Sequence, residues 1–163
     1  MEEAKRKIRI GWFSFSCCED NTIVFTELMN DHWQEWKALF DIRHARVLQS
    51  KNVLDEMDIA FIEGAIASPD HEERLKEIRR LSKKLVAVGS CACIGMPSAQ
   101  RNTFNEQQRE EINHLIARFH ALEKVKRVAD VVLVDAQVQG CPMDPNDFMA
   151  KMNALVAEIS HEV

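Results

Sequence analysis

Apolar residues follow two different periods along this chain. Five short runs are almost continuously apolar, as buried strands are, and the second is more polar, as an edge strand would be. The stretches between them repeat apolar residues every three or four positions, which is typical of amphipathic helices. The pattern predicts strands at residues 7–15, 42–48, 57–64, 84–90 and 130–138, with helices between them, the first over 22–40.

Local signals mark where the later helices begin. Ser68 precedes Pro69, as an N-cap residue precedes a proline in the first helical position. Thr103 and Glu106 have the spacing of a capping box, and Asp144–Pro145 opens the last helix. Strands that alternate with helices predict a parallel sheet covered on both faces. We therefore expect one α/β domain over residues 1–163, a flavodoxin-like three-layer sandwich with a five-stranded parallel sheet in the order 2-1-3-4-5.

Composition and charge narrow the classes of function. A composition of 46% apolar and 29% charged residues is typical of a globular protein, and no apolar run approaches the length of a membrane span. A net charge of −5, without a large basic block, makes nucleic acid an unexpected partner. No signal peptide is readable at the N-terminus, so the expected location is the cytoplasm, where thiols stay reduced. Five cysteines there indicate metal binding or catalysis before disulfides.

All five cysteines follow predicted strands. Cys17 and Cys18 come after the first strand, Cys91 and Cys93 after the fourth, and Cys141 after the fifth. Because ligands of such sheets bind beyond the carboxyl ends of the strands, we expect these thiols to meet at one edge. Adjacent cysteines rarely reach disulfide geometry, and their spacing is not that of a structural zinc site.

Thiolates from three loops match the four-cysteine ligation of a 4Fe–4S cluster. A tandem pair suits such a cluster, because each cysteine can bind a different iron. Four of the five glycines also flank these loops, which suggests backbone packed around something compact. A cluster is thus favoured over a flavodoxin-like FMN site, since the first loop lacks a phosphate-cradling Gly and Ser/Thr pattern and its Glu19 and Asp20 would repel phosphate.

Three motifs accompany the tandem cysteines: EGAI at 63–66, VGSCACIGMP at 88–97 and QGCPMDP at 139–145. In this order they resemble the family of nickel–iron hydrogenase small subunits and the 20-kDa-type subunit of respiratory complex I. The resemblance implies that Cys17, Cys18, Cys91 and Cys141 ligate one 4Fe–4S cluster, the one nearest the catalytic centre of a large subunit. Cys93 falls where the family usually has no ligand.

The resemblance also marks residues beside the cysteines. Gly89, Gly140 and Pro142 lie in the matching motifs and are expected to contact the cofactor. Glu63, which closes the third strand, is a candidate for proton handling near the cluster, although it would serve equally as a structural cap of the neighbouring loop. Apolar loop residues are unusual in solvent, so an interface with the large subunit is expected at Ile94, Met96, Pro97 and Met143.

The chain departs from the family pattern in two respects. Hydrogenase small subunits usually carry Cys-x-x-Cys after the first strand, whereas the tandem pair is typical of complex I. The sequence ends near residue 163, without the region that holds two further clusters in many hydrogenases. It therefore resembles the compact, one-cluster small subunits of soluble multi-subunit hydrogenases.

The expected function is electron transfer between a nickel–iron large subunit, which performs the hydrogen chemistry, and further iron–sulfur or flavin subunits. One alternative is a complex I-like quinone-module subunit whose large subunit lacks nickel and iron. Another is a thiol–disulfide redox sensor built on Cys91 and Cys93, which would leave the other three cysteines unexplained.

Overall fold

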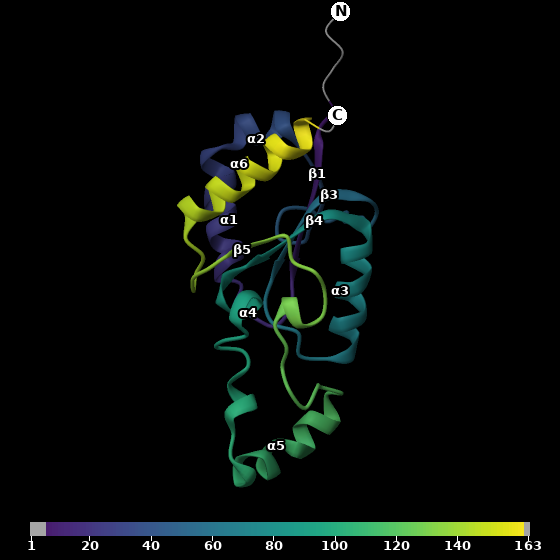
Figure 1. Ribbon diagram of the computed structural model, residues 1–163, viewed down its shortest axis with the longest axis vertical. Coiled ribbons are helices and arrows are strands. Elements are labelled where there is room, and N and C mark those ends of the chain that lie inside the picture. Colours follow the sequence, from purple (N-terminus) through teal and green to yellow (C-terminus); the bar gives the residue numbers. More distant parts are fainter. Residues whose placement is uncertain (1–5, 162–163) are drawn as a thin grey trace, which may run out of the picture.

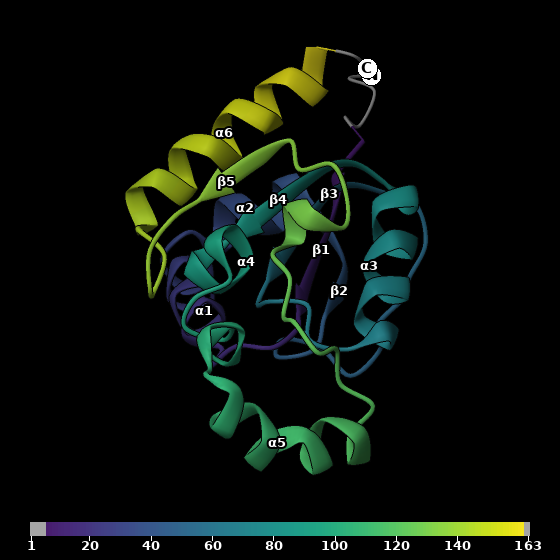
Figure 2. The same cartoon turned by 60° about the horizontal axis from the view of Figure 1, so that its bottom comes forward.

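The computed structural model describes residues 6–161 and places a twisted sheet between layers of helices (Figures 1 and 2). The neighbouring strands pair in parallel in the order β2-β1-β3-β4-β5, which confirms the predicted order. The strands are β1 (Ile8–Ser14), β2 (Phe40–Ala45), β3 (Met57–Glu63), β4 (Ser82–Val88) and β5 (Ala136–Val138).

Helices cover the two faces of the sheet unequally. The helices α1 (Asp20–Asp31), α2 (Trp33–Leu39) and α6 (Pro145–His161) share one face, and α3 (Pro69–Leu81) covers the other (Figure 1). Short α4 (Gly89–Ile94) and α5 (Glu106–Arg118) lie toward the edge where the strands end, and α5 stands apart from the sheet (Figure 2). Within residues 6–161, no helix has the length and apolar character that crossing a membrane requires.

Alternating strand residues build a separate core on each face. Trp12 of β1 points toward the face of α1 and α6, where its ring stacks on Phe25 with centroids 4.3 Å apart. Phe13, the next residue, joins the core beneath α3. Leu75 and Ile78 of α3 are fully buried there. The period of two along strands and of 3.6 along helices therefore places the core correctly.

Three boundaries differ from the sequence predictions. The helix expected over 22–40 is interrupted at His32, whose amide closes α1 on the Leu28 carbonyl and whose carbonyl accepts the Trp36 amide of α2. The second strand ends at Ala45, so residues 46–48 lie in an exposed turn. The fifth strand keeps only Ala136–Val138, because the preceding valines pack as an irregular segment on the core beneath α3.

The prediction that Thr103 and Glu106 form the capping box of α5 is wrong. Asn105 is the N-cap: its side chain accepts the Gln108 amide, and the Gln108 side chain accepts the Asn105 amide. An asparagine caps as well as a threonine, so two candidate caps close in sequence could not be separated by spacing alone. No residue of α5 is buried, and Phe119 just beyond it is 68% exposed.

A buried carboxylate lies near the amino ends of the strands, opposite the edge where the strands end. Asp58 of β3 is 0% exposed. Its oxygens accept hydrogen bonds from the Arg6 guanidinium at 2.9 Å and the Arg9 amide at 2.8 Å, and the Lys83 ammonium lies 3.4 Å away. Burial alone raises the pKa of Asp58, but these donors outweigh it and lower the pKa below its usual value.

Candidate metal centre

The four cysteines predicted as ligands lie at the carboxyl edge of the sheet. Cys17 and Cys18 connect β1 to α1, Cys91 lies in α4, and Cys141 follows β5. Their thiols are near enough to affect one another's ionisation: Cys91 raises the pKa of Cys17, and both Cys18 and Cys91 raise that of Cys141. The fold thus brings together thiols from three loops, as the sequence predicted, and their role as ligands stays a prediction.

Within residues 6–161, no three His, Cys, Asp or Glu side chains are grouped closely enough to hold a single metal ion. A 4Fe–4S cubane places fewer demands on proximity, because each cysteine binds its own iron atom at a separate corner. Cysteines that come from separate elements are therefore compatible with such a cluster.

Two of these thiols, Cys17 and Cys141, have a pKa raised above the ordinary value in the free chain. Burial raises the pKa of Cys17 to about 12, with a further contribution from the negative charge of Glu63. The pKa of Cys141 is raised first by desolvation and then by the neighbouring cysteines. A metal-bound thiol is deprotonated outright, so iron would supply the positive charge that such a site needs. Reactive sensor thiols have lowered pKa values instead.

Cys93 faces away from the other cysteines. It is 3% exposed, and its Sγ lies 3.4 Å from the Ala87 carbonyl oxygen and 3.5 Å from that of Val138. Burial raises its pKa to about 11. These contacts are those of a small core residue with a weak S–H donor, and they give no support to a redox pair with Cys91.

The glycines of the cluster loops are required by their immediate neighbours. Gly89 has φ +79°, and a Cβ there would lie 2.3 Å from the Asn21 side-chain nitrogen. Gly140 has φ +117°, and a Cβ there would lie 2.4 Å from the Pro142 carbonyl oxygen. Gly89 thus lets its segment approach the start of α1, and Gly140 lets the Cys141 loop turn tightly on itself. Contact of Gly89, Gly140 and Pro142 with a cofactor stays a prediction.

Asn21 joins these loops, although no sequence motif predicts this role. Its side chain is buried, with 6% exposure, and its Oδ1 accepts the Met143 amide at 2.8 Å. The Ser90 amide meanwhile donates to the Gly140 carbonyl at 2.7 Å. The start of α1, the start of α4 and the Cys141 loop are therefore held together by direct hydrogen bonds.

Glu63 lies at the centre of a buried hydrogen-bond network. It is 0% exposed, and its Oε1 accepts the Ser14 hydroxyl at 2.7 Å and the hydroxyl of Thr22. The Trp12 indole N–H donates in turn to the Thr22 oxygen at 2.9 Å. The second carboxylate oxygen, Oε2, has no hydrogen-bond partner within the described residues. Its effect on Cys17 places this carboxylate beside the first cysteine loop, as expected from the strand order.

The predicted apolar interface is only partly present. Ile94 and Met96 are 53% and 40% exposed, and Pro97 is also exposed. Met143, in contrast, is 2% exposed and belongs to the core with Phe148. The prediction for Met143 was wrong because the short pairing of Gly140 with Met143 turns this side chain inward.

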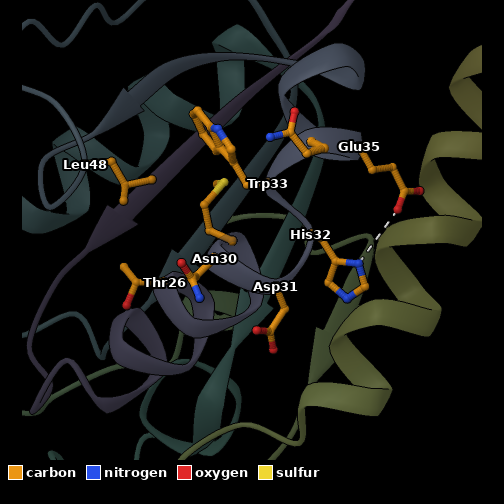
Figure 3. A pocket seen from close by; sticks show the side chains of 9 residues that line it. Thr26, Asn30, Asp31, His32, Trp33, Glu35 and Leu48 are labelled. Carbon is orange, nitrogen blue, oxygen red and sulfur yellow. Dashed lines mark ion pairs between the residues drawn. The ribbon is translucent and has the colours of Figure 1, made fainter.

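A hollow away from the candidate metal centre has no cysteine in its lining. It measures about 710 Å³ at the junction of α1 and α2 and is lined by Thr26, His32, Trp33 and Leu48 (Figure 3). Trp33 is 45% exposed, and the His32–Glu35 pair on its rim is 3.7 Å apart. Its ionisable lining residues are Asp31, His32 and Glu35, and none of the cysteine motifs contributes to it, so size alone does not identify the functional site.

Comparison with known proteins agrees with this geometry. The chain is 30% identical over 150 residues to the coenzyme F420 hydrogenase subunit gamma of Methanosarcina barkeri, covering 85% of this chain and 50% of that one. It is 24% identical to the NAD-reducing hydrogenase HoxS subunit delta of Cupriavidus necator, covering 92% and 79%. It thus spans about half the length of the first relative.

The structural comparison gives the same relationship. A chain in the crystal structure of an NAD+-reducing NiFe hydrogenase in the H2-reduced state superposes with a TM-score of 0.80 at 27% identity, covering 94% of this chain and 93% of that one. The family model for the NADH ubiquinone oxidoreductase 20 Kd subunit matches residues 18–155, which include all the candidate ligands except Cys17. The chain therefore belongs to the family of the NADH ubiquinone oxidoreductase 20-kDa subunit, which also contains the small subunits of nickel–iron hydrogenases.

Proposed function

We propose that this chain is the electron-transfer subunit of a multi-subunit nickel–iron hydrogenase in the cytoplasm. In this proposal Cys17, Cys18, Cys91 and Cys141 hold one 4Fe–4S cluster, the one nearest the large subunit. The observation that carries it is the gathering of these four thiols, from three loops, at one edge of the sheet. Family members in hydrogenases and in complex I bind iron–sulfur clusters, and the relatives named above are hydrogenase subunits.

A bound cluster would take up and release one electron at a time. The protein holds it through four thiolates, and the buried Cys91 and half-buried Cys17 limit the access of water to one side of the site. Asn21 keeps two of the loops in register, and Ser98 places its hydroxyl beside Cys91. Glu63 adds a buried negative charge near Cys17, where it can oppose the added electron or take up a proton with it.

The large subunit is proposed to dock on the cluster edge. Ile94 and Met96 are exposed next to Cys91, and adjacent exposed apolar side chains usually mark an interface. Hydrogen chemistry would take place on that partner. Because one cluster cannot link two distant centres by itself, further iron–sulfur or flavin subunits complete the proposed path.

Iron and sulfide analysis of the chain, reconstituted without oxygen, tests the cluster. About four irons and four sulfides per chain are expected, and each Cys→Ala change at positions 17, 18, 91 and 141 should remove most of both. Cys93→Ala is the matched control and should keep them. Retention of the cluster by Cys18→Ala together with its loss from Cys93→Ala would overturn the ligand assignment.

A complex I-like subunit is the second candidate. The tandem Cys17–Cys18 pair favours it, as does the description of the matching family. Metal analysis of the complex purified with its large subunit separates the two: nickel in proportion to that subunit supports a hydrogenase. A complex that contains iron and sulfide but no nickel would support the quinone-module alternative.

A further inference from the structure

A second hollow opens on the α3 side of the sheet, beside β1 and β2. It measures about 580 Å³, within the size range of small-molecule sites, and none of the cysteines lines it. Residues 46–56, between β2 and β3, form turns and loops instead of a helix. The part of the sheet nearest β2 therefore lacks the helical cover that α3 gives to β3 and β4.

Two aromatic–imidazole pairs form the walls of this hollow. The rings of Phe13 and His44 stack with centroids 4.3 Å apart. Phe15 and His71 meet edge to face, with centroids 5.2 Å apart. Such rings offer flat apolar surface against which a planar group can stack.

Both histidines keep one ring nitrogen available. The Nδ1 of His44 lies 2.9 Å from the Trp12 carbonyl oxygen, which can only accept, so Nδ1 carries the hydrogen. The Ala67 amide donates to Nδ1 of His71 at 3.4 Å, which leaves the hydrogen of that ring on Nε2. Neither Nε2 has a partner within residues 6–161, so the hollow presents one acceptor and one donor. Burial lowers the pKa of each histidine, which favours these neutral forms.

Two basic and two acidic side chains line the hollow. Arg46, just after β2, is exposed and forms no ion pair within the described residues, and Arg74 of α3 pairs only with Glu77 at an exposed site. Both arginines lie close enough to His44 to lower its pKa further. Glu19 and Asp70 also line the hollow, and Asp70 acts on His71. The hollow therefore offers both guanidinium donors and carboxylate acceptors to a ligand.

We propose that this hollow binds a small planar molecule that carries one phosphate or carboxylate group. Arg46, just after β2, and Arg74, on α3, bind the oxyanion, since guanidinium groups match the geometry of both anions. The planar part lies against the half-buried rings of Phe15 and His71, and Glu19 and Asp70 accept hydrogen bonds from the ligand's donors. This site uses none of the cluster residues and does not depend on the proposed electron transfer.

Calorimetric titration of the full chain with four probes tests the proposal. Phenyl phosphate and benzoate combine a ring with an anion, whereas inorganic phosphate and phenol supply one feature each. Saturable binding of a combined probe, at least about tenfold tighter than of either single-feature probe, is expected. The tighter of the two combined probes identifies the natural ligand as a phosphate ester or a carboxylate.

Variants locate the binding. Arg46→Met and Arg74→Met should each weaken the better probe at least about tenfold. Arg80→Met is the matched control: Arg80 is exposed on α3 but does not line the hollow, so this change should leave binding unaltered. The proposal is overturned if no probe saturates, or if Arg80→Met weakens binding as much as Arg46→Met does.

Discussion

The hydroxyl oxygen of Ser98 lies 3.2 Å from the Sγ of Cys91 and 2.8 Å from the Ser16 carbonyl oxygen. Its one hydrogen can serve only one of these acceptors at a time. A thiolate at Cys91 would draw that hydrogen, because hydrogen bonds to charged acceptors are stronger than those to neutral ones. Ser98 therefore connects the first cysteine loop to Cys91 and can respond to the charge on its sulfur.

Ser98→Ala should lower the reduction potential of the cluster. Hydrogen bonds to cluster sulfurs favour the reduced form by stabilising its additional negative charge, and alanine removes this donor. Redox titration followed by electron paramagnetic resonance measures the change. Ser98→Thr keeps the hydroxyl and should stay close to the wild-type potential. An equal shift in both variants would show that packing, and not the hydrogen bond, is responsible.

Glu63→Gln should raise the same potential, by on the order of tens of millivolts. Glutamine keeps the shape and an acceptor for Ser14 and Thr22 but removes the negative charge that opposes an added electron. If Glu63 takes up a proton with the electron, the variant's potential should also depend less on pH. Glu110→Gln, on exposed α5, is the control for net charge. Identical potentials and pH slopes in wild type and Glu63→Gln would leave Glu63 a purely structural role.

The elements that local signals define were predicted well. Ser68 accepts the His71 amide at 3.2 Å as the N-cap of α3, as its place before Pro69 indicated. Strand order followed from apolar runs separated by helices, and the shared edge of the cysteines followed from strand order. These inferences need only the neighbouring residues and the geometry of a parallel sheet.

The features that were missed depend on partners distant in the sequence. Asn21 and Met143 are 122 positions apart, and nothing near either residue indicates their hydrogen bond. Ser98 reaches Ser16 across 82 positions. The region before the shortened fifth strand also has a distant partner, since the Asp135 carboxylate accepts the Leu85 amide at 2.7 Å.

Asn21→Ala should destabilise the protein by about 1–3 kcal/mol, the cost of leaving a buried polar group without its partner. The Met143 amide would lose its acceptor, and space would open beside Gly89. Urea unfolding measures the loss. Asn30→Ala, at an exposed position of the same helix, is the control and should change stability by less than about 0.5 kcal/mol. Equal losses in the two variants would contradict a special role for Asn21.

Asp58 should make stability depend on pH. Because its folded pKa is lowered, its contribution is present above the unfolded value of about 3.9 and is lost as the pH falls through the folded value. Asp58→Asn should therefore cost about 1–3 kcal/mol at pH 7, and the difference from wild type should shrink below about pH 4.

Urea unfolding at about pH 7 and below about pH 4 checks this prediction. Iron is removed from wild type and variant alike, so that loss of a cluster in acid does not affect the measured difference in stability. Asp31→Asn, at an exposed position at the end of α1, serves as the control. A difference between wild type and Asp58→Asn that stays constant with pH would show that the charge of Asp58 contributes nothing.

Ile94→Asp should weaken assembly with the large subunit without removing the cluster. Ile94 is 53% exposed beside Cys91, and a charge buried without a partner in an apolar interface is costly. Association at least about tenfold weaker is expected, with unchanged iron per chain. Leu133→Asp is the control, because Leu133 is 73% exposed in the segment before β5 and lies outside the proposed interface. If both variants assemble equally well, and hydrogen–deuterium exchange around Ile94 and Met96 is the same with and without the partner, the large subunit does not cover this edge.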